Sequence, residues 1–232
     1  MFEATVCPSA RLQGCEAEGP DGTRAPGVRV RLCGRDEPQR RMEVNGEMRA
    51  GNRGSLELVS TIVRDPKPAE FEALLERRQR LGQDRWDEER DGVYYLNPSP
   101  THEHQRLSQQ LAVILDPLAK GAGLEAVVGG VNIGEKGNYV IPDASLHRPG
   151  AGGTYVPTAA LAIEILSPGD DTWEKVPFYA RRGVEELAIV DPRERRVTWL
   201  ELGTENEYRE VERSRVIELS AAELADRFDW PR

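Results

Sequence analysis

Three charged residues have the types and the order along the chain that a catalytic site would need. Glu164 interrupts the apolar run Leu161–Leu166, which would otherwise be an ordinary buried β-strand. A lone carboxylate in such a strand costs free energy unless a cation or a metal ion pairs with it. Asp143 lies upstream of this run and Lys175 lies downstream of it. Two acids with a lysine close by form the arrangement that a metal-dependent phosphodiesterase needs.

The two acids can act together if the strands that carry them are neighbours. Side chains alternate along a strand, so Asp143 would share a face with Ser145, and by the same rule Glu164 would share a face with Ala162. Both carboxylates could then bind Mg²⁺ or Mn²⁺, because magnesium takes oxygen ligands and keeps several waters. The metal would polarise the scissile phosphate and lower the pKa of a bound water. Lys175 would orient that water and stabilise charge on the phosphate.

Each of these residues also has a plain structural interpretation. Glu164 could be a partly exposed carboxylate on an edge strand, although its apolar neighbours disfavour this. Asp143 follows Pro142, and Pro-Asp pairs are common in turns. Lys175 could be a solvated helix lysine, which is the usual fate of lysines. The combination of the three residues, and not any one of them, favours the catalytic interpretation.

Further polar residues leave alternatives open. His104 lies on the apolar face of a predicted helix, where it could be a core histidine or could approach the metal-bound water or a phosphate. His102 and His147 are predicted to be surface residues. Glu88 could be another active-site acid, but it belongs to the acidic cluster Asp87–Asp91, which favours a solvated face.

The elements that must position these residues follow from hydrophobic periodicity and turn signals. A helix is predicted from Pro68, and a hairpin at Trp86–Leu96 with its turn at Asp91-Gly92. Thr101 is a candidate N-cap for a second helix, which Pro117 is expected to end. The remaining predicted elements are strands at Glu125–Ile133 and Tyr139–His147, the Glu164 strand, a short helix ending at Gly183, strands at Glu186–Pro192, Arg196–Leu202 and Glu207–Glu212, and a helix at Ser220–Phe228. This order predicts one α/β domain with a mixed sheet.

The first part of the chain differs in composition from the rest. Residues 1–55 are rich in Gly, Pro, Arg and Glu and have few large apolar side chains. Burial could not offset the entropy cost of ordering such a segment. Residues 1–55 are therefore predicted to be a poorly ordered segment and residues 56–232 a folded domain. An alternative is that translation begins at Met48.

The overall composition limits the classes of function. The 232 residues are 38% hydrophobic and 31% charged, and they contain no apolar run that approaches a membrane span and no secretory signal. The three cysteines all lie in the N-terminal segment without a Cys-x-x-Cys pair, which predicts reduced thiols and a cytoplasmic protein with no membrane partner. A net charge of −9 argues against a protein that coats DNA, but a nucleic-acid enzyme needs acids for its metal and only a local basic groove.

Six short motifs occur together in one order. They are Glu88-x-x-Asp91-Gly92, Pro100-x-x-x-His104, Ile141-Pro142-Asp143, Ala162–Pro168, Lys175-x-x-x-Tyr179 and Gly183–Pro192. In this order and spacing the chain resembles the Uma-type family of putative restriction endonucleases, a branch of the PD-(D/E)xK nuclease superfamily, over about residues 68–215. The resemblance implies a restriction-endonuclease-like α/β fold, with a mixed central sheet flanked by helices, and divalent-metal nuclease chemistry in the domain at 56–232.

The lysine departs from the general superfamily pattern. That pattern has a lysine two residues after the strand acid, where this sequence has Leu166. The branch that the chain resembles has the lysine in the following helix instead, where Lys175 lies. The expected activity is hydrolysis of phosphodiester bonds in DNA, with Mg²⁺ or Mn²⁺ bound by Asp143 and Glu164. The expected catalytic residues are Asp143, Glu164, Lys175 and His104.

Two other classes of function stay open at this point. One is a nucleic-acid-binding module that keeps the fold but lacks turnover, and the other is an interaction protein in which the acids are structural. Metal binding would separate the enzyme from the first class, because a binding module need not hold a divalent ion through Asp143 and Glu164. In the second class, replacement of Glu164 with glutamine should change nothing but stability. By analogy alone, a homodimer would allow two cuts in a duplex.

Overall fold

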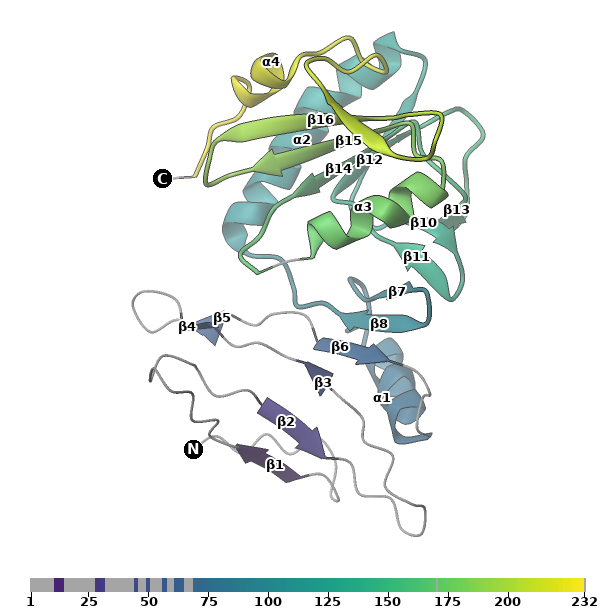
Figure 1. Ribbon diagram of the computed structural model, residues 1–232, viewed down its shortest axis with the longest axis vertical. Helices are drawn as coiled ribbons and strands as arrows, with labels where there is room; N and C mark the ends of the chain where they lie inside the picture. The colour runs from purple at the N-terminus through teal and green to yellow at the C-terminus, as the bar shows by residue number, and fades with distance from the viewer. Residues whose placement is uncertain are drawn as a thin grey trace. The chain divides into compact units, whose positions relative to one another are not determined.

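The computed structural model describes residues 69–169 and 171–231, together with the backbone of six short strands within residues 1–68 (Figure 1). The chain divides into two compact units, Met1–Pro98 and Ser99–Arg232. Most of the segment 1–55 lies outside the described residues, so its separation from 56–232 stays a prediction.

The N-terminal unit contains antiparallel strand pairs and one helix. Its elements are β1 (Arg11–Gly14), β2 (Val28–Arg31), β3 (Val44–Asn45), β4 (Arg49–Ala50), β5 (Leu56–Glu57), β6 (Thr61–Arg64), α1 (Ala69–Arg80), β7 (Glu88–Arg90) and β8 (Val93–Leu96). Strand β8 pairs with β7 and β6. Asp91 and Gly92 join β7 to β8 with φ angles of 51° and 78°, the positive values that a tight two-residue hairpin turn requires. The predicted first helix and hairpin are both present.

The C-terminal unit is built on a six-stranded mixed sheet. Its elements are α2 (His102–Gly121), β9 (Glu125–Val128), β10 (Asn132–Glu135), β11 (Asn138–Val140), β12 (Ala144–His147), β13 (Tyr155–Val156), β14 (Leu161–Ile165), α3 (Thr172–Arg181), β15 (Glu186–Asp191), β16 (Arg196–Leu202), β17 (Tyr208–Val211) and α4 (Ala221–Ala225). The strand order is β17-β16-β15-β14-β12-β9, and only β14 and β15 run parallel. This mixed sheet with flanking helices confirms the predicted fold class.

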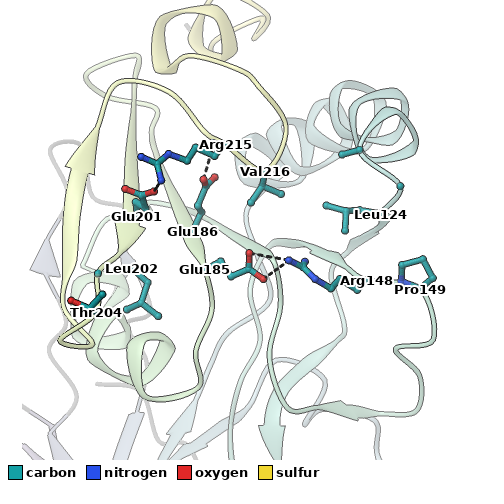
Figure 2. Close-up of a pocket in the computed structure, with 13 residues that line it drawn as sticks. Leu124, Arg148, Pro149, Glu185, Glu186, Glu201, Leu202, Thr204, Arg215 and Val216 are labelled. Carbon is teal, nitrogen blue, oxygen red and sulfur yellow. Dashed lines mark hydrogen bonds and ion pairs between the residues drawn. The ribbon is translucent and has the colours of Figure 1, made fainter.

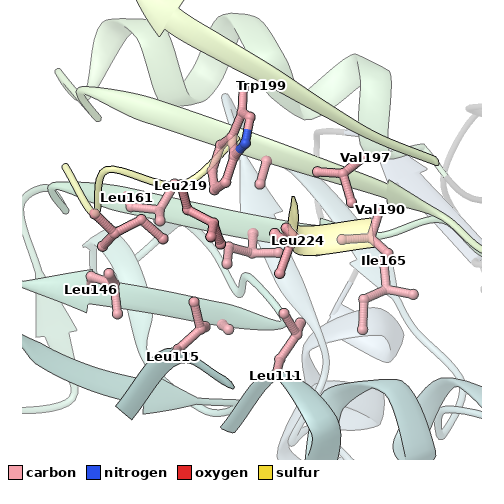
Figure 3. Packing of buried hydrophobic residues seen from close by; sticks show 14 of the residues in the cluster. Leu111, Leu115, Leu146, Leu161, Ile165, Val190, Val197, Trp199, Leu219 and Leu224 are labelled. Carbon is pink, nitrogen blue, oxygen red and sulfur yellow. The ribbon is translucent and has the colours of Figure 1, made fainter. Parts of the chain in front are cut away.

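Helix α2 covers one face of the six-stranded sheet. Leu107, Leu111 and Leu115 recur at helical spacing, are 1%, 0% and 0% exposed, and pack on sheet residues such as Leu146 and Leu161 (Figure 3). Truncation of one such leucine to alanine costs about 2–5 kcal/mol, so this contact fixes the helix firmly on the sheet. Anything that projects from the first turns of α2 is therefore held in place relative to the strands.

Helix α2 does not end at Pro117 as predicted, but continues to Gly121. Pro117 is exposed, so its ring and the missing backbone hydrogen bond face solvent. Leu118 and Ala119 follow it and pack on the core, with Ala119 only 1% exposed. Burial of this last turn outweighs the cost of one proline. The predicted N-cap is confirmed, because the Thr101 hydroxyl accepts a hydrogen bond from the backbone N–H of His104 at 3.3 Å.

Helix α3 belongs to a second hydrophobic cluster, separate from the one beneath α2. Phe178 and Tyr179 of α3 are 3% and 0% exposed and share this cluster with Ala162 of β14 and Leu187 of β15. Strands β10, β11 and β13 contribute to the same cluster through Ile133, Val140 and Val156. The helix ends before Gly183, whose φ of 67° agrees with its predicted C-terminal role.

Two predicted strands are each broken in the structure. The predicted strand Glu125–Ile133 is divided into β9 and β10 at Gly129 and Gly130, which have φ angles of 65° and 86°. The predicted strand Tyr139–His147 is divided into β11 and β12 around Pro142, which has no N–H for a sheet ladder. The two breaks lie side by side, because the N–H of Gly129 donates to the carbonyl of Asp143 at 2.9 Å. Asp143 therefore lies at a bend and not within a strand.

Candidate active site

Glu164 is buried in the second-last position of β14 and has polar partners on α3. Its residue is 3% exposed, and the Tyr179 hydroxyl donates to Oε1 at 2.5 Å. The Nζ atom of Lys175 lies 3.3 Å from the same oxygen. The interpretation of Glu164 as an exposed edge carboxylate is wrong, because β14 lies between β12 and β15. A buried carboxylate is tolerated here because a hydrogen-bond donor and a cation both reach it.

Helix α3 presents Lys175 and Tyr179 to the sheet together. Residues four apart lie on one face of a helix, and both side chains contact Glu164. Lys175 is the fourth residue of α3, close to its start as the sequence predicts, and its side chain is only 10% exposed. The alternative of a solvated lysine is therefore wrong. Tyr179 was not among the predicted site residues, although its spacing from Lys175 carries the signal.

Asp143 lies at the bend before β12 and is held by two contacts through one carboxylate oxygen. Oδ2 accepts a hydrogen bond from the backbone N–H of Ile165 at 2.7 Å. The Nε2 atom of His104 lies 3.2 Å from the same oxygen. The Asp143 side chain is 16% exposed, so it is a fixed and mostly buried group, not a solvated turn residue.

His104 projects from the first turn of α2 towards Asp143, with a side chain that is 11% exposed. Ser108 lies one turn further along, where its hydroxyl is 3.4 Å from Nδ1 of His104 and donates to the His104 carbonyl at 3.1 Å. His104 thus faces a carboxylate, whereas its approach to a metal-bound water or a phosphate stays a prediction. Ser108 is an addition that sequence reasoning missed.

The four predicted catalytic residues thus form two contacting pairs in one region. His104 contacts Asp143, and Lys175 contacts Glu164. The pairs meet through the backbone, because the N–H that binds Asp143 belongs to Ile165, the residue after Glu164. In the sheet register Ala144 of β12 is opposite Ile163 of β14, so Asp143, which directly precedes β12, lies across from Glu164.

A divalent metal ion is chemically compatible with these acids, although the donor set is small. Within residues 69–169 and 171–231, no group of three or more His, Cys, Asp or Glu side chains could hold a metal. Two carboxylates are enough for Mg²⁺ if water and a backbone carbonyl complete its shell. Both contacts of Asp143 described above use Oδ2, so Oδ1 is the atom that could bind an ion. The metal-binding role of the pair stays a prediction.

His147 was expected at the surface, and this prediction is wrong. Its residue is 3% exposed, and Nε2 lies 2.8 Å from the hydroxyl of the buried Ser145. Burial lowers the pKa of His147, an effect that a backbone group of Thr158 and the charge of Glu125 oppose in part. His147 is the last residue of β12, whereas Asp143 precedes its first residue, so His147 lies at the far end of the strand from Asp143. His102 is exposed, as predicted.

Glu88 belongs to the N-terminal unit and is not solvated. It is 1% exposed, and its Oε2 atom lies 3.7 Å from Nε of Arg90, which is 5% exposed. The expected solvated face is therefore wrong for this residue. The guanidinium of Arg90 also stacks over Tyr95, with 3.5 Å to the ring centroid. A catalytic role for Glu88 stays open.

A cavity of about 800 Å³ lies at the opposite strand ends, and it has a different character (Figure 2). It is lined by Glu185, Glu186 and Glu201 together with arginines. Glu201 pairs with Arg215 at 2.7 Å, and arginine contacts lower the pKa of that carboxyl. Burial raises the pKa of Glu186, which accepts hydrogen bonds from the Ser214 hydroxyl and a backbone N–H. Its acids are thus satisfied within the protein, and none of its lining residues is a lysine.

Comparison with known protein families identifies the family of this chain. The chain belongs to the Uma2 family, described as putative restriction endonucleases, which matches residues 68–227. This confirms the resemblance drawn from the motifs. No curated protein matches the chain.

Solved structures support the fold. A crystal structure of a putative nuclease belonging to DUF820 from Anabaena variabilis ATCC 29413 matches with a TM-score of 0.51 and 17% identity, covering 61% of this chain and 90% of that one. This likeness confirms the predicted α/β fold with a mixed central sheet. A cryo-EM structure of a DrdV–DNA complex matches at 18% identity with a TM-score of 0.30, covering 54% of this chain and 13% of that one, which is too partial to support an argument. Among the described helices, none is both long and apolar enough to cross a membrane.

Proposed function

We propose that this protein is a divalent-metal-dependent nuclease that hydrolyses phosphodiester bonds in DNA. The observation that supports this most directly is the 2.7 Å hydrogen bond from the N–H of Ile165 to Asp143. It holds one carboxylate against the backbone next to Glu164, at the end of the strand where Lys175 also lies. Membership of a family described as putative restriction endonucleases agrees with this chemistry.

The charges at the site suit a divalent cation and a phosphate. Asp143, Glu164 and Lys175 together leave one negative charge when His104 is neutral. A bound Mg²⁺ or Mn²⁺ would make the local charge positive and would supply Lewis-acid polarisation of a phosphate oxygen. The two carboxylates would hold the ion, and the burial of Glu164 reduces competition from solvent.

The remaining groups have positioning and electrostatic roles in this proposal. Lys175 orients the attacking water and stabilises charge on the phosphate as the water oxygen attacks phosphorus and the ester oxygen leaves. Tyr179 fixes the Glu164 carboxylate through its hydroxyl. His104 fixes the Asp143 carboxylate and is close enough to exchange a proton with a water at that site.

Metal-dependent melting combined with plasmid cleavage tests this proposal. At a metal concentration of 100 times its Kd, binding stabilises the native state by about 2.7 kcal/mol. For a chain of this size that raises Tm by about 5–10 °C. Asp143→Asn and Glu164→Gln should each lose most of this gain and all cleavage. Glu174→Gln is the matched control, because Glu174 is an exposed acid in the first turn of α3.

The outcomes separate the three classes of function. A metal-dependent gain with cleavage that both variants abolish supports the enzyme. An equal gain in the wild type and in both variants would show that the metal site is elsewhere. Metal-independent DNA binding without cleavage would indicate a binding module. A Glu164→Gln protein that differs from the wild type in stability alone would indicate an interaction protein. Appearance of linear plasmid, as opposed to nicked circles, would be the result expected if two copies of the chain cut together.

A further inference from the structure

A groove of about 410 Å³ lies along the first two turns of α2 and is not used by the chemistry proposed above. It is lined by His102, Gln105, Arg106, Ser108 and Gln109 of α2 and by Val128, the last residue of β9. Its polar side chains are hydrogen-bonding groups that are neutral or cationic at pH 7. None of these six lining residues is an acid.

The groove lies next to residues of the candidate active site. Ser108 lines it, and the hydroxyl of this serine lies 3.4 Å from Nδ1 of His104, which contacts Asp143. On the other side Val128 is opposite Ala144, the residue after Asp143. A strand bound in the groove would therefore lie beside the Asp143 end of the site.

The charge of the groove is unusual for this protein. The whole chain has a net charge of −9, and the larger cavity at the other strand ends is lined by three glutamates and two arginines. The net charge disfavours binding of a polyanion, whereas Arg106 and the two glutamine amides of the groove offer it donors without a lining acid. Phosphate oxygens in protein–DNA complexes are bound by arginine and by uncharged side chains such as glutamine.

We propose that this groove binds the phosphodiester strand next to the scissile bond, with Arg106 as its phosphate contact and Gln105 and Gln109 as hydrogen-bond donors. The inference rests on the proposed nuclease function and names the path that its substrate takes to the site. Arginine suits this task because its planar fork binds two phosphate oxygens at once.

Asp229 acts as a competitor for Arg106. In the free protein NH2 of Arg106 lies 2.7 Å from Oδ2 of Asp229, and the two side chains are 48% and 81% exposed. An exposed pair of this kind is worth at most about 1 kcal/mol, so a phosphate can replace the carboxylate. Gln110 holds the backbone of Asp229 by two hydrogen bonds, which keeps this carboxylate at the groove. Removal of the Asp229 charge should therefore strengthen binding.

Binding of short fluorescent DNA in metal-free buffer, measured by anisotropy, tests the groove separately from cleavage. Arg106→Ala should raise Kd and reduce the slope of log K against log salt by about 0.9 for a duplex, the loss of one phosphate contact. Gln109→Glu should raise Kd by roughly tenfold, because it places a carboxylate in the path of the strand. Asp229→Asn changes the other partner of the Arg106 ion pair and should lower Kd, the opposite of the effect of Arg106→Ala.

Two exposed positions at turns distant in sequence supply matched controls. Arg193→Ala removes the same charge from the β15–β16 turn, and Asn206→Asp adds the same charge to the β16–β17 turn. Neither should change Kd beyond the small effect of net charge. If Arg106→Ala and Gln109→Glu bind like these controls, the groove is not the DNA path, even if the enzyme cleaves DNA normally. If the groove variants weaken binding but the wild type cleaves nothing, the groove assignment holds and the nuclease proposal fails. No DNA binding by the wild type would overturn both.

Discussion

Replacement of Lys175 by methionine tests whether Lys175 forms a stabilising buried ion pair or behaves like a surface lysine. Methionine keeps the length of the side chain and removes its charge. Lys175 and Glu164 are 10% and 4% exposed at their side chains, with 3.3 Å between Nζ and Oε1. The substitution would leave the Glu164 charge buried with the Tyr179 hydroxyl, and without the ammonium.

The size of the effect follows from that burial. Loss of one partner from a buried ion pair typically costs 3–5 kcal/mol, because the other charge stays desolvated. The Tyr179 hydrogen bond continues to stabilise the carboxylate, so we expect the free energy of unfolding to fall by about 3 kcal/mol. For a chain of this length that corresponds to a fall in Tm of about 6–12 °C. The double variant Glu164→Gln/Lys175→Met should recover most of this loss, because it buries no unpaired charge.

Melting curves and plasmid cleavage in manganese buffer, run in parallel, provide the assay. Lys120→Met is the matched control: Lys120 pairs with Asp116 at 2.7 Å, but these side chains are 73% and 56% exposed. That exposed pair should contribute less than about 1 kcal/mol. If Lys175→Met melts like Lys120→Met, the buried Lys175–Glu164 pair contributes no more to the free energy of unfolding than the exposed pair does. If it melts low but cleaves like the wild type, the basic catalytic group is elsewhere, and His104 is the first candidate.

Three further predictions concern other parts of the chain. Tyr179→Phe removes the hydroxyl that binds Glu164, so the free energy of unfolding measured with urea should fall by about 1.5–3 kcal/mol. Its effect on kcat should be larger than its effect on KM. Burial lowers the pKa of His147, so the unfolded chain binds a proton at a higher pH than the native chain. Tm should therefore fall as the pH drops below about 6.5. His147→Gln should flatten this dependence in melting curves recorded over a series of pH values. A chain of residues 56–232 should melt close to the full chain, and a large loss of Tm would show that residues 1–55 contribute to the fold.

Local patterns in the sequence predict much of the fold, because each of them acts within a few residues. The Asp91-Gly92 turn, the Thr101 N-cap and Gly183 after α3 all appear where their backbone requirements place them. Ser220 forms a capping box with Glu223 at the start of α4. These signals depend on φ angles and on nearby hydrogen bonds, which distant parts of the chain do not alter.

Features that depend on tertiary packing escape the same reasoning. Pro117 would end an isolated helix, but burial of Ala119 in the core carries α2 past it. His147 looks like a strand-end surface residue, yet it is enclosed beside Ser145. Lys175 was correctly placed near the start of α3, whereas its burial against Glu164 depends on how α3 packs on the sheet. Such outcomes depend on partners far away in the sequence.

The bend before β12, and not the alternation of a strand, sets the direction of the Asp143 side chain. Strand alternation would place Asp143 on the face of Ser145, which is opposite Ala162 of the α3 cluster. Its carboxylate instead contacts His104, on the helix that covers the other face. The pairing of the strands on either side of the bend explains this. Val128 of β9 is opposite Ala144 of β12, and Ile133 of β10 is opposite Val140 of β11, so the β9–β10 segment holds one more residue between these pairs than the β11–β12 segment. An extra residue of this kind bends a hairpin and redirects a side chain. The bend thus turns Asp143 across the end of β14, where one carboxylate contacts both α2 and the backbone beside Glu164.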